Sequence, residues 1–149
     1  MSNRKKRVLL LILLIGTYLL AFVMNFMPAI KHPDLNLDRI DLITSILFAT
    51  FLFMYSSTGS KKLRIFSMVG IFSGIAIFLI VNFEGVMSDN FILNVIASLQ
   101  YPLYLIFTIP FFGGNLLFNV NYATYALYLS IFYVIVLGLS IYFKKKNEI

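Results

Sequence analysis

The chain contains no cysteine and only one histidine, His32, among its 149 residues. Without cysteine, neither a disulfide framework nor a thiolate metal site can form. A zinc site would have to combine His32 with carboxylates alone, which is an unusual ligand set for zinc. We therefore expect no metal and no other cofactor.

Charged residues are also scarce. They make up 12% of the chain against 60% for hydrophobic residues, and the mean hydropathy is +0.92. An ordinary soluble domain is about 25% charged and about 45–50% apolar. A chain this short has too much surface for its volume to bury so many apolar side chains away from water. The composition indicates an integral membrane protein, with residues 1–149 forming one polytopic membrane domain.

Five apolar runs, separated by short polar connections, predict an all-α compact bundle of membrane helices. Their approximate bounds are 8–29, 40–57, 63–83, 90–112 and 120–143. The first run follows a basic stretch, as a secretory signal does. It is longer than a usual signal core and no A-x-A site follows it, so we interpret it as a retained anchor. Pro28 is expected to end or kink that helix.

Positive charge is concentrated beside the apolar runs. Ten of the twelve Lys and Arg residues fall in three clusters, at residues 4–7, 61–64 and 144–146. This distribution is typical of cytoplasmic flanks next to anionic lipid headgroups, and not of a nucleic-acid-binding patch. We expect anionic lipids at these clusters, no nucleic-acid partner, a plasma-membrane location and a cytoplasmic N-terminus.

The fourth run leaves the threading of the chain open, because no charged residue occurs between positions 91 and 143. If all five runs cross, seven basic residues lie on the N-terminal side and five on the other. If the fourth run turns back, the partition becomes ten and two, which the positive-inside rule favours. A re-entrant fourth segment is therefore our preferred interpretation, and a fifth complete span is the alternative.

Helix-breaking residues within the fourth run agree with a re-entrant segment. Gln100, Tyr101 and Pro102 lie near its centre, and Pro110 follows. A buried amide is costly and a proline removes a backbone hydrogen bond. We predict two half-helices that meet at Gln100–Pro102 and, with Asn115, form a candidate polar site beside the break. Proline-kinked spanning helices are the common alternative.

Two further groups of residues are candidates for structural or binding roles. Ser67, Gly70 and Gly74 share one helix face, where small residues let two helices approach closely. Their partner is more often another helix of the same chain than a second copy, and homo-oligomerisation stays open. Three acidic residues fall at helix ends and share the outer face in the preferred orientation: Asp41, Glu84 and Asp89.

Two patterns have both a functional and a structural interpretation. The connection at 30–41 carries His32 and several carboxylates, which suit either a small cation or headgroup site or a solvated loop with Asp38 as a helix N-cap. Tyr122, Tyr125 and Tyr128 fall along one side of a helix. This stripe predicts either a groove for a lipid or peptide, or an interface belt with packing between helices.

Charged residues occur only at the ends of the apolar runs, as Asp41 and Arg64 do, and not in their interior, where proton relays and ion paths usually place one. This favours a non-enzymatic accessory or interaction protein that contacts lipid or a larger membrane-protein partner. An envelope stress or immunity role suits its size. The alternatives are a small carrier or channel component for a neutral or lipidic solute, resembling transporters in its broken helix, and an interfacial enzyme using His32 with Glu84 and Asp89.

Overall fold

The computed structural model describes residues 3–34, 36–87 and 91–148. The chain is 90% helical, and the described residues contain no strand. The elements in chain order are α1 (Asn3–Lys31), α2 (Arg39–Ser56), α3 (Lys61–Met87), α4 (Phe91–Ser98), α5 (Gln100–Leu103), the π-helical turn η1 (Tyr104–Thr108), the 3-10 helix η2 (Ile109–Gly114), α6 (Asn115–Phe118) and α7 (Tyr122–Glu148). Five helical stretches are long and apolar enough to cross a membrane, which confirms the predicted all-α bundle.

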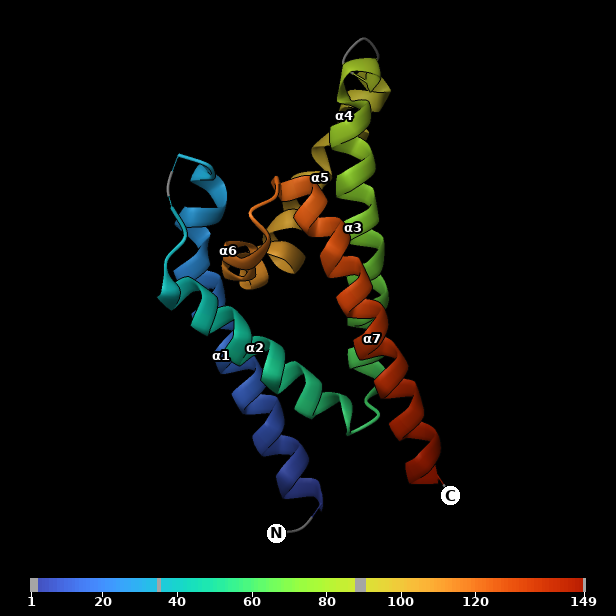
Figure 1. The fold of residues 1–149 in the computed structure, drawn as a ribbon. Coiled ribbons are helices and arrows are strands. Elements are labelled where there is room, and N and C mark those ends of the chain that lie inside the picture. The colour runs from blue at the N-terminus through green and yellow to red at the C-terminus, as the bar shows by residue number, and fades with distance from the viewer. Residues whose placement is uncertain (1–2, 35, 88–90, 149) are drawn as a thin grey trace.

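Two helix pairs form the frame of the bundle. α1 packs on α2, and α3 packs on α7 (Figure 1). α3 and α7 are antiparallel, since Gly59 just before α3 lies against Lys144, and Gly74 lies against Ala126. Between the pairs, in the half of the bundle away from the termini, lies the segment from α5 to α6 (Figure 1). Both termini lie at the same end of the bundle (Figure 1).

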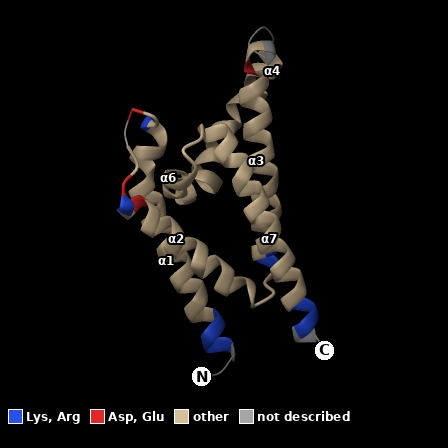
Figure 2. Cartoon of the chain, in the orientation of Figure 1, with Lys and Arg blue, Asp and Glu red and all other residues tan. Residues whose placement is uncertain are grey.

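Charge divides the bundle into two ends (Figure 2). The three basic clusters lie at the end that holds both termini, which we call the basic end. Asp34, Asp38, Asp41 and Glu84 lie at the opposite, acidic end, the first three near the α1–α2 connection and Glu84 near the α3–α4 turn (Figure 2), whereas Glu148 ends α7 at the basic end. The partition agrees with the arrangement predicted for a fourth segment that turns back.

Residues 91–118, which we call the fold-back segment, turn around inside the bundle. The segment begins beside the end of α3, at the acidic end. The segment comes back to the level of Gln100 before α7 begins. Tyr122, the first residue of α7, has its hydroxyl 3.5 Å from Gln100 Oε1 and its ring 5.4 Å from that of Tyr104. Between Gln100 and Tyr122 the segment extends toward the start of α3, where Phe107 contacts Phe66 at 5.0 Å between ring centroids. α7 then runs back to the basic end.

The turn lies later in the chain than the sequence predicts. The helix does break beside the predicted point, at Leu99 between α4 and α5, but the chain does not reverse there. Gln100–Pro102 belong to α5, and Pro102 lies in its first turn, where a missing N–H costs little. The reversal is made by η1 and η2 instead. Pro110 is the second residue of η2, and Gly113 near its end lies so close to α2 that a Cβ atom on it would collide with the backbone of Asp41. Such a close approach has no room for a side chain, so the glycine determines where the chain can turn.

Carbonyl groups released by the irregular backbone are satisfied by side chains of other helices. Non-helical backbone at membrane depth needs such partners, because lipid offers none. Tyr18, Tyr125 and Tyr133 donate to Ile106 O at 3.2 Å, Phe111 O at 2.6 Å and Phe107 O at 2.9 Å respectively, and Asn25 Nδ2 and Ser45 Oγ both donate to Pro110 O at 3.2 Å. Three helices, α1, α2 and α7, thus hold the turn in place.

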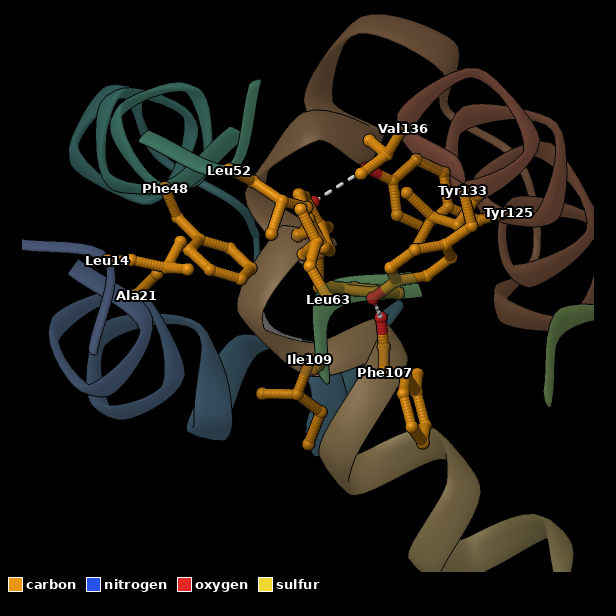
Figure 3. Packing of buried hydrophobic residues seen from close by; sticks show 14 residues of the cluster. Leu14, Ala21, Phe48, Leu52, Leu63, Phe107, Ile109, Tyr125, Tyr133 and Val136 are labelled. Atoms are coloured by element: carbon orange, nitrogen blue, oxygen red, sulfur yellow. Dashed lines mark hydrogen bonds between the residues drawn. The ribbon is translucent and has the colours of Figure 1, made fainter. Parts of the chain in front are cut away.

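Aromatic and aliphatic side chains of the turn fill the middle of the bundle, and we call them the plug. Its members are Phe107, Ile109, Phe111 and Phe112, each 7% exposed or less. Phe111 contacts Phe48 of α2 at 4.6 Å between ring centroids. Figure 3 shows Phe48 and Leu52 from one side, and Tyr125 and Tyr133 from the other, packed around this segment. The fold-back segment is therefore a central part of the core.

The helix ends follow local chemistry. Asp38 is the N-cap of α2, with Oδ1 accepting from Ile40 N and Asp41 N, and Asp41 Oδ2 accepts from Asp38 N. This capping box confirms the predicted cap and satisfies otherwise free backbone N–H groups. α1 does not end at Pro28 but continues to Lys31.

Candidate functional site

Two cavities lie toward the acidic end and share His32; we call them together the recess. The Gln100 cavity, of about 420 Å³, is lined by Ala29, Ile30, His32, Gln100, Tyr101, Tyr104, Leu105 and Tyr122. The Asn115 cavity, of about 580 Å³, is lined by His32, Pro33, Asn36, Leu37, Asn115, Leu116 and Asn119. The recess therefore combines amide, phenol and imidazole groups with an apolar wall, and such mixed concave surfaces are typical of binding sites.

The Gln100 cavity is built by the end of α1, α5, η1 and the start of α7. Gln100 is 5% exposed, and its Oε1 accepts a long hydrogen bond of 3.5 Å from the Tyr122 hydroxyl. Tyr104 donates to Ala29 O at 3.0 Å and so ties the wall of the cavity to α1. Tyr101 is 64% exposed beside them. The cavity thus presents a weakly engaged amide next to phenol groups, which can bind a polar group of a ligand or partner.

Asn115 has a structural role that the sequence does not reveal. Its side chain is 1% exposed, with Nδ2 donating to Val120 O at 2.8 Å and Oδ1 accepting from Val120 N at 3.2 Å. These bonds close the turn after α6, where Asn119 adopts a left-handed conformation with φ of 49°. The amide is therefore occupied by its own loop. His32, Asn36 and Asn119 supply the other polar side chains of this cavity.

His32 lines both cavities and also packs on the plug. Its ring meets that of Phe112 edge to face at 5.4 Å between ring centroids. Among the described residues, no three His, Asp or Glu side chains gather closely enough to hold a metal ion. Since 80 positions separate His32 from Phe112, only tertiary structure could reveal that it belongs to the recess.

The other predicted site residues are distributed over different parts of the fold. The structure brings Gln100 and Tyr101 into one cavity, leaves Pro102 exposed on α5 and buries Pro110 in the turn. Asp41 is buried in the capping box, and Glu84 is exposed near the end of α3. Asp89 lies outside the described residues.

The small-residue face of α3 packs against α7. A Cβ atom at Gly74 would collide with Ala126 O, and one at Gly70 would lie 2.7 Å from the Tyr133 ring. Ser67 is fully buried one turn earlier, and its hydroxyl has no hydrogen-bond partner. This face is thus covered by a helix of the same chain.

The three tyrosines at the start of α7 do not line one groove. Tyr125 is 3% exposed and donates into the turn, Tyr122 lines the Gln100 cavity, and Tyr128 is 41% exposed. The sequence did not reveal which carbonyl groups the side chains that hold the turn would meet; these side chains are Tyr18, Asn25, Ser45, Tyr125 and Tyr133. Their signal is a polar group within an apolar helix, which indicates interhelical bonding but not its partner.

No protein-family model, curated protein or solved structure matches this chain. The fold itself defines a small multi-pass helical membrane protein. Its function has to be inferred from the recess, the plug and the distribution of charge.

Proposed function

We propose that this chain is a non-enzymatic accessory protein of the plasma membrane, which binds a membrane-protein partner through the recess. Both termini then lie in the cytoplasm, because the ten basic residues of the basic end follow the positive-inside rule. The recess faces the opposite side of the membrane. α1, α2, α3 and α7 cross the bilayer, and the fold-back segment is re-entrant.

The observation that carries this proposal is the packing directly behind the recess. His32 and Tyr104, which line the recess, both contact Phe112, at 5.4 and 6.1 Å between ring centroids. Phe112 is fully buried, and the neighbouring Phe107 and Ile109 are 7% and 0% exposed. A path for a polar solute needs polar groups or water along its length, whereas Phe107, Ile109 and Phe112 behind the recess are apolar. The recess is therefore suited to binding at the surface.

A second candidate is a small carrier or channel component for a neutral or lipidic solute. The Gln100 cavity favours it, since an amide and several phenols adjoin a broken helix, as at transporter binding sites. This function would require the plug to move. In reconstituted vesicles we expect glycerol permeation equal to that of protein-free vesicles. Faster permeation that Gln100→Leu abolishes would support the carrier instead.

Site-specific photocrosslinking in native membranes tests the accessory function. Benzoylphenylalanine replaces Tyr101 or Leu116, which line the two cavities and are 64% and 39% exposed. We expect both positions to give a discrete protein adduct of higher mass, because a partner seated in the recess contacts both. Ile131 on α7, 59% exposed, is the matched apolar control and should give no discrete protein adduct. Identical patterns at all three positions, or no protein adduct at Tyr101 and Leu116, would contradict the proposal.

A further inference from the structure

A third cavity lies on the other side of the plug, between α1, α2 and α3. It measures about 340 Å³ and is almost wholly apolar, with Lys62 as its one charged lining residue. Its lining is Leu11, Leu14, Ile15, Tyr18, Phe48, Leu52, Tyr55, Lys62, Leu63 and Phe66. This apolar cavity shares no residue with the recess.

The apolar cavity extends from the basic end toward the plug. Lys62 lies in the basic cluster at the start of α3. At the other extreme, Tyr18 donates to Ile106 O, and Phe66 packs on Phe107 at 5.0 Å between ring centroids. Since a helix rises about 1.5 Å per residue, the wall from Leu11 to Tyr18 is about 10 Å long. The cavity is thus a slot that runs along the helices and is closed at its inner end.

Chemistry limits what this slot can bind. A buried water needs about two to four polar partners, and the lining offers few. The slot is accessible from the bilayer, because Leu11 and Ile15 in its wall are 40% and 51% exposed. Hydrocarbon chains are the solvent at this depth. A lysine at the end where lipid headgroups lie adds an attraction for negative charge.

We propose that the apolar cavity binds one acyl chain of an anionic phospholipid, whose phosphate pairs with Lys62. The aliphatic wall contacts the chain, and the aromatic rings of Tyr18 and Phe66 set the depth that the chain reaches. Lys62 provides the preference for an anionic headgroup. The bound lipid also bridges the α1–α2 pair and α3.

Native mass spectrometry of the full chain tests the headgroup preference. The protein is titrated with phosphatidylglycerol or phosphatidylcholine in detergent. We expect one phosphatidylglycerol to bind in preference to phosphatidylcholine, and Lys62→Gln to weaken that preference about fivefold, which corresponds to one lysine near a lipid surface. Lys61→Gln removes the same charge from a neighbour that does not line the cavity, and should leave the preference unchanged. Equal losses in the two variants would overturn the assignment to Lys62.

A second variant tests the acyl-chain site. Leu11→Trp adds bulk to the wall, and Leu9→Trp adds it at a position on α1 that is 47% exposed and does not line the cavity. We expect Leu11→Trp to lose the specific lipid adduct and Leu9→Trp to keep it. If Leu11→Trp is not monodisperse, Ile15→Phe provides the same obstruction with less added volume. An adduct retained equally by the obstructing and control variants would overturn the proposal.

Discussion

Gly113→Ala is expected to prevent normal closure of the bundle. The added methyl group would collide with the backbone carbonyl of Asp41 and approach Leu42 N to 2.7 Å. Both colliding groups are backbone, at the start of a capped helix, so neither can rotate away. We expect destabilisation of about 3 kcal/mol, the upper part of the usual range for overpacking. The measurement is the temperature at which the detergent-solubilised protein loses its monodisperse chromatographic peak.

The matched control for Gly113 is Gly16→Ala in α1. Nothing lies within 4 Å of a Cβ atom at Gly16, and alanine is preferred to glycine in a helix by about 1 kcal/mol. The control should therefore be neutral or slightly stabilising. A Gly113→Ala protein that is as stable as the control would show that the fold-back segment does not approach α2 so closely.

Gly74→Ala is expected to separate α3 from α7. Its methyl group would collide with Ala126 O and come within 2.9 Å of Ser130 Cβ. Membrane helices depend on such close packing, because lipid removes the hydrophobic drive for their association. We expect a loss of about 2 kcal/mol or more through overpacking, visible as a lower melting temperature in the same assay.

Gly138→Ala, on the partner helix α7, is the control for Gly74. A Cβ atom there meets nothing within 4 Å, so this variant should melt at or above the wild-type temperature. Because Gly113 and Gly74 lie at different interfaces, the two destabilising effects should be additive within a few tenths of a kcal/mol. Unchanged stability in Gly74→Ala would contradict the close α3–α7 contact.

Local chemistry was enough to predict the helical segments and one helix cap. The apolar runs are set by bilayer thickness, and Asp38 caps α2 through atoms two and three residues away. The position of the turn could not be predicted in this way. It depends on Pro110 O meeting Asn25, 85 positions away, and on the contact of Gly113 with Asp41.

The candidate site was predictable only in part, for the same reason. Gln100 could be selected because a buried amide in an apolar run needs a partner. Its partner Tyr122 comes from the next helix and was considered only as part of a tyrosine stripe. Asn115 was selected on the same evidence as Gln100, but its amide is consumed by Val120 within one turn. Sequence identifies polar groups at membrane depth, whereas tertiary contacts decide which of them stay available.

The fold-back of residues 91–118 is tested most directly by labelling single cysteines in intact cells. The chain has no cysteine of its own, so Glu84→Cys, Asn119→Cys and Lys146→Cys each introduce a unique thiol. Asn119 lies after the turn, so the fold-back predicts that Glu84→Cys and Asn119→Cys both react with a membrane-impermeant maleimide. Lys146→Cys should react only after permeabilisation. Protection of Asn119→Cys, with labelling of Lys146→Cys in intact cells, would mean a fifth complete crossing and would contradict the fold-back.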